Sequence, residues 1–504
     1  MNVAAHRRLP QIAILGVPVM VGVVIVNSML QWMASPFFKA IGEALSSIAG
    51  AVVIYLGSFA TALVMVQRAP RDVHKRGTRL LDGFRPSRAS EAGAGITLAG
   101  HPIPTLDETR HFKLIGTTGT GKSTAIHEML TAALRRGDRA VIADPDGSYT
   151  TAFFDVTRGD VILSPFSPGA ARWDLFAEIA EPQDADQLAR ALIPDYEGSD
   201  RSWRQYGRTF LAAILRQLHR AGETDLAKLY WILLIAPVDE LRELLDATPA
   251  APFLGSDNGK FFESVRSITA AHVSSIEHFA RQRTGEPSLV RRWVRAGKGV
   301  LFLPYRASEI ASLRHVISAW MRLAIFQAME PTDTEQRLWF VVDELDAMGA
   351  IDGLKDALAR LRKFGGRCVL GFQSIAQVRG TYGDAEAQTI VENCGNTLIL
   401  RCSASERGGT SEFASRLIGK REVIRPHSSV SRPVSSIIGT KDVRTTSHQH
   451  TLEDAVLASE IEQLPDLNGF LKIASRQEWV RVSLNAPTGS ARHSNVEMPI
   501  PRRS

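Results

Sequence analysis

The sequence predicts an α/β fold with three parts: a mostly parallel sheet carrying a phosphate-binding loop, an all-helical domain inserted into it, and an N-terminal pair of apolar helices. Three observations carry this prediction. Short apolar runs alternate with helical segments, which is typical of parallel sheets. One run leads into Gly-x-x-x-x-Gly-Lys-Ser at residues 116–123. Two long segments, residues 11–38 and 44–66, hold no charged side chain.

The composition excludes several classes of protein. The chain has 504 residues with 44% hydrophobic and 22% charged side chains, which are ordinary globular values. Global disorder and collagen-like structure are therefore excluded, and the length predicts several structural units. The cysteines Cys368, Cys394 and Cys402 are too few for a disulfide framework and lack metal-ligand spacing. They fit a reduced, cytosolic environment.

The basic balance of the chain is local. The formal net charge is +6, but residues 1–88 hold ten Lys/Arg and three Asp/Glu, so the remainder carries a net charge of −1. The excess flanks the two apolar segments. We therefore interpret it as a signal for membrane topology rather than for nucleic-acid binding.

The two apolar segments predict a transmembrane hairpin. A helix over the 23 residues 44–66 would rise about 34 Å, enough to cross the hydrocarbon core. Basic residues precede the first segment and follow the second, so both flanks are predicted to be cytoplasmic. An alternative is that residues 11–38 form a cleaved signal peptide. That would export the phosphate-binding loop, so the hairpin is the better interpretation.

The glycine-rich loop predicts a nucleotide site. It follows an apolar strand at residues 111–115 and precedes a helix at 124–135, the context that this motif requires. Its backbone N–H groups and the helix N-terminus would bind the phosphates of ATP. Lys122 would reach the β- and γ-phosphates, and Ser123 would ligate Mg²⁺. The predicted nucleotide-binding residues are Gly116, Thr117, Thr118, Gly119, Thr120, Gly121, Lys122, Ser123 and Thr124.

A second motif supplies carboxylates. The apolar run 338–342 ends in Asp343-Glu344, and we expect this strand to lie next to the strand of the phosphate-binding loop. Asp343 would hold Mg²⁺, and Glu344 would act as general base toward the attacking water. The alternative is a carboxylate pair that caps the following helix.

Two further strand ends carry polar side chains. Gln373 follows the run 366–372, at the edge where ligands bind in open parallel sheets, and is predicted to sense the γ-phosphate. The alternative is a helix-capping amide. Asp144 ends the run 140–144; it either faces the same crevice or forms a turn beside Pro145.

A basic cluster precedes the strand 366–372 and contains Arg360, Arg362, Lys363 and Arg367. In a ring of subunits, one such arginine can enter the γ-phosphate site of a neighbour. We predict this role for Arg362. The alternative is a solvated basic helix end.

The chain between the two halves of the sheet is predicted to be all-helical. The helices cover residues 186–193, 202–220, 225–234, 238–246, 260–280 and 288–295, with no strand among them and with both junctions close together on the sheet. Further strands are predicted at 161–163, 300–303 and 397–401, a loop or extended hairpin at 420–449, and a closing hairpin over 469–474 and 478–482. The predicted domains are 1–70, 71–172, 173–295, 296–490 and a disordered tail at 491–504.

The inserted domain is rich in arginine. Its arginines either contact nucleic-acid phosphates or form a solvated face, and we favour the solvated face for most of them. The arginines in question are Arg201, Arg204, Arg208, Arg281, Arg283, Arg291 and Arg292.

Taken together, these motifs resemble the coupling proteins of type IV secretion and conjugation, of the TraD/TrwB type. The resemblance covers nearly the whole chain, and its ordered set of motifs is specific. It is carried by the two apolar segments, the loop 116–123, the helical insertion, the strand ending in Asp343-Glu344, and the segments 362–366, 371–374, 460–461 and 464–467.

The resemblance implies a RecA-like ATPase core and a homohexamer anchored in the bacterial inner membrane. It implies an ATP-driven motor that pumps single-stranded DNA, or a relaxase–DNA complex, to a type IV secretion channel. By matching motifs, Lys122, Ser123, Asp343, Glu344 and Gln373 carry over as nucleotide residues and Arg362 as the interfacial arginine. The inserted domain would meet the relaxosome.

Two other functions are weighed against this one. A hexameric motor for chromosome segregation would carry more membrane spans and a C-terminal winged helix, which the sequence does not show. An ATP-binding membrane receptor that hands protein substrates to a secretion channel is the second alternative. Glu344 beside Asp343 favours hydrolysis, but protein cargo stays open.

Overall fold

The computed structural model describes residues 72–81, 95–195, 198–282, 284–331, 337–406, 409–431 and 443–485, together with Gly22. The chain divides into two compact units. One contains residues up to 75 and 422–452, and the other contains residues 76–421 and the chain from 453 onward. The predicted helical insertion thus belongs to the same compact unit as the sheet.

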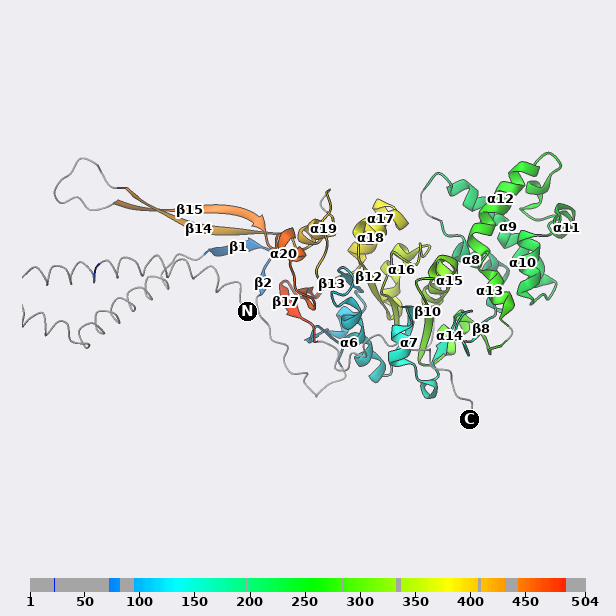
Figure 1. Cartoon of the computed structure of the whole chain (residues 1–504), viewed down its shortest axis with the longest axis horizontal. Helices are drawn as coiled ribbons and strands as arrows, with labels where there is room; N and C mark the ends of the chain where they lie inside the picture. The colour runs from blue at the N-terminus through cyan, green and yellow to red at the C-terminus, as the bar shows by residue number, and fades with distance from the viewer. Residues whose placement is uncertain are drawn as a thin grey trace, which may run out of the picture. The chain divides into compact units, whose positions relative to one another are not determined.

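The core of the larger unit is a ten-stranded sheet with the strand order β2-β17-β16-β13-β5-β12-β11-β6-β10-β7. The strands from β13 to β7 pair in parallel, and β16 and β17 add an antiparallel hairpin at one side (Figure 1). The predicted α/β fold with a large parallel sheet is therefore confirmed. The strands are β2 Leu80–Leu81, β5 Phe112–Ile115, β6 Arg139–Pro145, β7 Val161–Ile162, β10 Val300–Tyr305, β11 Leu338–Val342, β12 Gly366–Phe372, β13 Asn396–Ile399, β16 Asn468–Lys472 and β17 Trp479–Ser483.

Helices cover both faces of this sheet, because successive side chains of its buried strands point to opposite faces. Trp339 and Val341 of β11 join one core, with α6. Phe340 and Val342 join the other, with α15, α16 and α18. The helices of the core are α5 Thr105–Glu108, α6 Lys122–Arg135, α7 Ser148–Phe153, α15 Ile310–Gln327, α16 Leu354–Leu361, α17 Ile375–Tyr382, α18 Asp384–Asn393, α19 Gly409–Ile418 and α20 Ala458–Glu462.

The insertion forms a helical domain beside this core (Figure 1). Its helices are α8 Pro182–Leu192, α9 Arg201–Arg220, α10 Leu226–Leu234, α11 Val238–Leu244, α12 Gly259–Val273, α13 Ile276–Arg281 and α14 Val290–Ala296. Three aromatic rings join it to core helix α15: the Trp320 centroid lies 5.5 Å from both Trp173 and Phe279. This cluster is buried, with no ring more than 2% exposed.

The expectation of a strand-free insertion is wrong at its base. Strand β8, Arg172–Trp173, pairs in parallel with β9, Pro287–Ser288. Two-residue strands are too short to show an alternating pattern, so periodicity does not reveal them. The pair brings the entrance and the exit of the insertion side by side.

Several smaller elements complete the described chain. Strands β3, Thr97–Leu98, and β4, His101–Pro102, form a short antiparallel pair. In the segment predicted as a loop or extended hairpin, β14, Lys420–Ser431, and β15, Val443–Asp454, form a three-stranded sheet with β1, Val73–Gly77. The three cysteines are buried and unbonded.

The predicted transmembrane segments lie outside the described residues, apart from Gly22. Among the helices that the structure does describe, none combines the length and the apolar character that crossing a membrane requires. The predicted tail at 491–504 also lies outside the described part.

Candidate nucleotide site

The glycine-rich loop joins the end of β5 to the start of α6. Gly119 and Gly121 have φ of +76° and +117°, a region that other residues enter only with strain. At Gly121 an added Cβ would also meet Leu467 and Leu484 at 2.9 Å. Glycine at these positions therefore lets the backbone curl tightly ahead of the helix N-terminus.

Lys122 lies over the loop that precedes it. Its Nζ donates to the carbonyl oxygens of Gly116 at 2.7 Å and Thr117 at 3.3 Å. Burial lowers the pKa of Lys122, while the nearby carboxylates of Asp343 and Glu344 act in the opposite direction. The ammonium group thus lies at the phosphate-binding loop with acidic side chains close by.

Ser123 meets Asp343 at the same place. The hydroxyl of Ser123 donates to Oδ2 of Asp343 at 2.6 Å. A second hydroxyl, from Tyr149, donates to the same oxygen at 2.8 Å. These hard oxygen groups fit Mg²⁺, which typically takes one or two protein ligands and completes its shell with phosphates and water.

The prediction that strand 338–342 lies next to the loop's strand is wrong. Strand β12 lies between β5 and β11. Asp343 still reaches Ser123 because Gly371 of β12 has no side chain: an added Cβ would lie 2.3 Å from the Asp343 carbonyl oxygen. The Leu345 backbone N–H then donates to the Gly371 carbonyl at 2.9 Å.

Glu344 and Gln373 form a second link to the loop. The Gln373 amide nitrogen donates to Glu344 Oε1 at 3.0 Å, and its oxygen accepts from the Thr118 hydroxyl at 2.8 Å. Burial raises the pKa of Glu344, and the charges of Asp343 and Asp346 raise it further. The carboxylate is thus a stronger base than an exposed glutamate.

Of the two roles considered for Asp144, the structure favours the turn-forming one. It is fully buried, and its carboxylate accepts from the backbone N–H groups of Tyr149 at 3.0 Å and Thr150 at 2.6 Å. Burial raises its pKa to about 6 despite these bonds. It therefore holds the first turn of α7 after strand β6.

Arg362 does not join this group of side chains. It is exposed and lies in the turn Arg362–Phe364, before β12 begins, whereas Gln373 follows the end of β12. A strand of seven residues separates the two by roughly 20 Å. Its neighbour Arg367 is buried, donates to Glu108 at 2.8 Å and lies over the Trp339 ring. Only the exposed members of the basic cluster are accessible to another subunit.

Sequence reasoning missed several polar groups near the site. Tyr149 was not predicted, because its contact with Asp343 depends on the pairing of strands β6 and β11 in the sheet. The hydroxyl of Tyr305, at the end of β10, is buried and has no hydrogen-bond partner among the described residues. Oδ1 of Asp346 is likewise unpaired within that part of the chain. For Tyr305 a signal was its place at the carboxyl end of β10.

The arginines of the insertion mostly face partners within the fold, so the expected solvated face is wrong for the buried ones. Arg204 and Arg208 are 4% and 5% exposed. The ion pairs are Arg201–Asp195, Arg208–Asp195, Arg281–Glu277 and Arg291–Asp184. Arg292 lines a cavity, and Arg283 lies outside the described residues.

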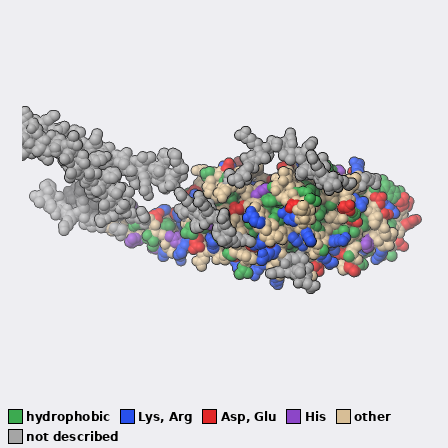
Figure 2. Space-filling view, turned by 90° about the horizontal axis from the view of Figure 1, so that it is seen from below, with side chains coloured by type: hydrophobic (Ala, Val, Ile, Leu, Met, Phe, Trp, Pro, Cys, Tyr) green, Lys and Arg blue, Asp and Glu red, His purple; other side chains and the backbone are tan. Residues whose placement is uncertain are grey.

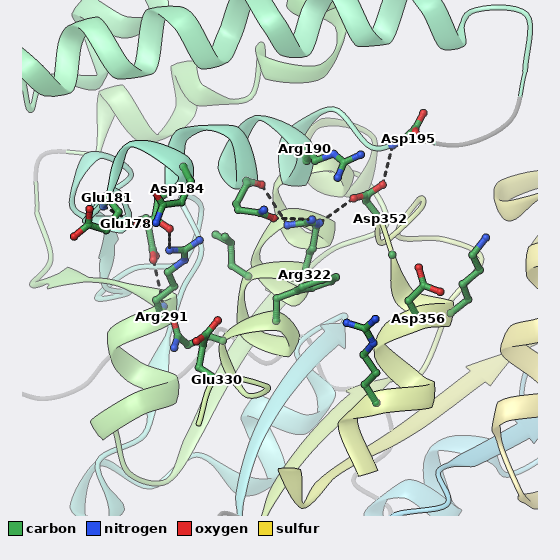
Figure 3. A pocket seen from close by; sticks show the side chains of 18 of the residues that line it. Glu178, Glu181, Asp184, Arg190, Asp195, Arg291, Arg322, Glu330, Asp352 and Asp356 are labelled. Atoms are coloured by element: carbon green, nitrogen blue, oxygen red, sulfur yellow. Dashed lines mark hydrogen bonds and ion pairs between the residues drawn. The ribbon is translucent and has the colours of Figure 1, made fainter. Parts of the chain in front are cut away.

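A cavity of about 950 Å³ lies apart from the loop, between α8 and α14 of the insertion and α15, α16 and α18 of the core (Figure 3). Its lining holds equal numbers of basic and acidic side chains. Arg322 donates to Asp352 at 3.0 Å and to Gln187 at 3.0 Å, and so ties the insertion to the core. The cavity therefore has no excess of one charge.

The parallel sheet with its strand–loop–helix at β5 and α6 defines a P-loop protein. The chain belongs to the type IV secretion-system coupling protein family, since the model for the "Type IV secretion-system coupling protein DNA-binding domain" matches residues 95–485. This bears out the family resemblance seen in the sequence.

Two curated relatives illustrate the similarity. Coupling protein TraD of Escherichia coli (strain K12) is 30% identical over 400 residues, which are 78% of this chain and 55% of the relative. Type IV secretion system-coupling protein VirD4 of Bartonella henselae is 26% identical over 272 residues, 51% of this chain and 38% of the relative. The chain thus spans about half or less of the length of these relatives.

Solved structures show the same fold. The bacterial conjugative coupling protein TrwB in an unbound form is 30% identical, with a TM-score of 0.73 over 83% of this chain and 95% of that one. TrwB in complex with the ATP analogue ADPNP is 30% identical, with a TM-score of 0.73 over 84% of this chain and 97% of that one. TrwB in complex with ADP and Mg²⁺ is 30% identical, with a TM-score of 0.72 over 84% of this chain and 96% of that one.

Proposed function

We propose that this chain is a membrane-anchored, ATP-driven coupling protein that moves single-stranded DNA, or a relaxase–DNA complex, to a type IV secretion channel during conjugative transfer. One observation carries the proposal: Lys122, Ser123, Asp343 and Glu344 converge at one edge of the sheet in a chain of this family. Relatives of the same fold are described in complex with nucleotide.

The geometry supports ATP hydrolysis. The N–H groups of the loop and the ammonium of Lys122 would bind the phosphates, with Ser123 and Asp343 holding Mg²⁺. Bound Mg²⁺ would offset the charge on the phosphoryl oxygens. Glu344 would take a proton from the attacking water, and its raised pKa suits a base working near neutral pH. Gln373 would orient Glu344 through their hydrogen bond and would sense the γ-phosphate through Thr118.

The position of Arg362 supports assembly into a homohexamer. It lies at the opposite end of β12 from its own site, so any role at a γ-phosphate requires a neighbouring subunit. In such a ring, DNA would pass through a central channel and contact a few loops of each subunit. Figure 2 shows Lys and Arg interspersed with Asp and Glu on the face in view, as expected when DNA binding does not depend on a large basic surface.

The apolar segments 11–38 and 44–66 support anchoring in the bacterial inner membrane, with the ATPase in the cytoplasm. A second candidate function is an ATP-binding receptor that hands protein substrates to the secretion channel. The net charge of −1 beyond residue 88 also fits this function, because binding a protein substrate requires no basic surface.

The test uses the full chain reconstituted in lipid nanodiscs. ATP hydrolysis is measured alone and with single-stranded DNA, duplex DNA or candidate relaxase protein. Stimulation by single-stranded DNA is expected, and Lys122→Ala should abolish turnover while the exposed Lys260→Ala should not. Stimulation by protein substrate alone would favour the receptor, and unchanged turnover in Lys122→Ala would contradict the site.

A further inference from the structure

Tyr149 contacts the carboxylate that we assign to the metal. Its hydroxyl donates to Oδ2 of Asp343 at 2.8 Å, and the hydroxyl of Ser123 donates to the same oxygen at 2.6 Å. Tyr149 is fully buried and Asp343 is 4% exposed. The three groups thus form one hydrogen-bonded cluster beside the phosphate-binding loop, in which Tyr149 and Asp343 are buried and Ser123 is exposed.

The fold holds Tyr149 in place from both its backbone and its ring. Strands β6 and β11 pair in register, with Ala143 opposite Val342, so the segments that follow them leave the sheet together. The buried Asp144 accepts from the backbone N–H of Tyr149 at 3.0 Å. The ring stacks on His127 of α6, with centroids 4.9 Å apart and an interplanar angle of 26°.

We propose that Tyr149 is a positioning residue for the magnesium ion. Its hydroxyl fixes the orientation of Asp343, whose oxygen then accepts the single hydroxyl proton of Ser123. With that proton directed to Asp343, the lone pairs of Ser123 are left for the metal. Groups that orient metal ligands in this way typically contribute about 10–100-fold to metal affinity. The inference rests on the proposed function.

A role limited to packing would give a different result. Phenylalanine keeps the ring that stacks on His127 and removes only the hydroxyl. If Tyr149 serves packing alone, Tyr149→Phe leaves the Mg²⁺ requirement unchanged. If it positions Asp343, the substitution weakens the response to Mg²⁺ and spares nucleotide contacts that need no metal.

The experiment titrates Mg²⁺ into the full chain with a fluorescent ATP analogue and follows binding rather than turnover. For Tyr149→Phe the half-saturating Mg²⁺ concentration should rise about 10-fold. Affinity for the analogue in EDTA should match the wild type. Tyr230→Phe is the matched control, because that hydroxyl lies 3.5 Å from Glu277 in the insertion, and its Mg²⁺ response should be unchanged.

The outcomes separate this inference from the proposed function. If the nucleotide affinities of the wild type and of Tyr149→Phe respond to Mg²⁺ in the same way, only the proposed role of Tyr149 is overturned. A wild type that binds no nucleotide overturns the proposed function as well. If Tyr149→Phe lowers the unfolding midpoint, Tyr149→Met provides a second side chain without a hydroxyl that adapts to the same space.

Discussion

Gln373 donates a hydrogen bond to Glu344 at 3.0 Å, although the two residues follow different strands of the sheet. The same amide accepts from Thr118 of the phosphate-binding loop at 2.8 Å. A change at the loop is therefore transmitted directly to the proposed general base. Sensing of the γ-phosphate would require no larger movement than a shift of this one amide.

Replacing Gln373 by leucine should slow hydrolysis. The variant loses a hydrogen bond to a charged group, typically about 1.5–3 kcal/mol, which corresponds to a rate lower by roughly 10- to 100-fold. Nucleotide affinity should change little. The control is Gln388→Leu, which breaks an exposed Gln–Glu pair on α18. Single-turnover hydrolysis checks the prediction, and equal rates in the two variants would contradict it.

Glu344→Gln should separate binding from chemistry. The amide keeps the size of the side chain but cannot take a proton from water. We expect turnover to fall at least about 100-fold while the ATP analogue still binds. Equilibrium binding and steady-state hydrolysis, measured on the same preparation, provide the check. Retained turnover would move the general base to another residue.

Mixing variants tests whether Arg362 acts on a neighbouring subunit. In mixed rings of Arg362→Ala and Glu344→Gln chains, some sites combine an intact glutamate with an intact arginine. Activity should therefore exceed the average of the two separate variants. The control mixes Arg362→Ala with the double variant Arg362→Ala/Glu344→Gln. No subunit in this mixture has Arg362, so no complete site can form. A mixture no more active than this average would count against a shared site.

The buried His111 should make stability depend on pH. Burial lowers its pKa from 6.5 to about 4 in the folded chain. Its ring accepts from the Cys368 backbone N–H at 3.1 Å, and its other nitrogen lies 2.9 Å from the Leu358 carbonyl oxygen. Between pH 6.5 and 4 the unfolded chain therefore binds more protons. The stability present above pH 6.5 falls as the pH decreases, by about 3 kcal/mol in total.

The measurement compares unfolding midpoints of the wild type and His111→Gln at pH 7 and pH 5. Glutamine does not titrate, so the advantage of the wild type should shrink at pH 5. His219→Gln, at an exposed histidine of α9, is the control for the substitution itself. A difference between wild type and His111→Gln that stays constant with pH would refute the prediction.

Trp320→Ala should loosen the attachment of the insertion. The side chain is 1% exposed and packs edge-on against Trp173 and Phe279. Removing a buried tryptophan leaves a cavity and typically costs about 3–5 kcal/mol. Trp231→Ala, at a site that is 37% exposed, is the control. Urea unfolding measures both, and similar midpoints would contradict the prediction.

The parts that sequence predicted well depend on local patterns. The loop 116–123 has a fixed spacing between a strand and a helix, and the helices of the insertion have clear apolar periodicity. The carboxylate pair was visible because an apolar run ends at Asp343. Each of these features is contained in a short stretch of chain, so no knowledge of the strand order was needed.

The parts that it missed depend on long-range pairing. The place of β12 between β5 and β11 follows from chain that comes after both strands. The contact of Tyr149 with Asp343 joins two segments that follow the neighbouring strands β6 and β11 and are far apart in sequence. The buried arginines of the insertion resemble solvated ones until their partners, such as Asp195 for Arg208, are placed beside them.

The pairing of β8 with β9 has a consequence for how such proteins can diversify. Since the chain leaves the core at Trp173 and returns at Pro287, next to the point of departure, the interruption is local. A helical domain of different size with similarly spaced ends can be exchanged there without altering the strand order. The inserted domain can thus change while the sheet and its candidate nucleotide site are kept.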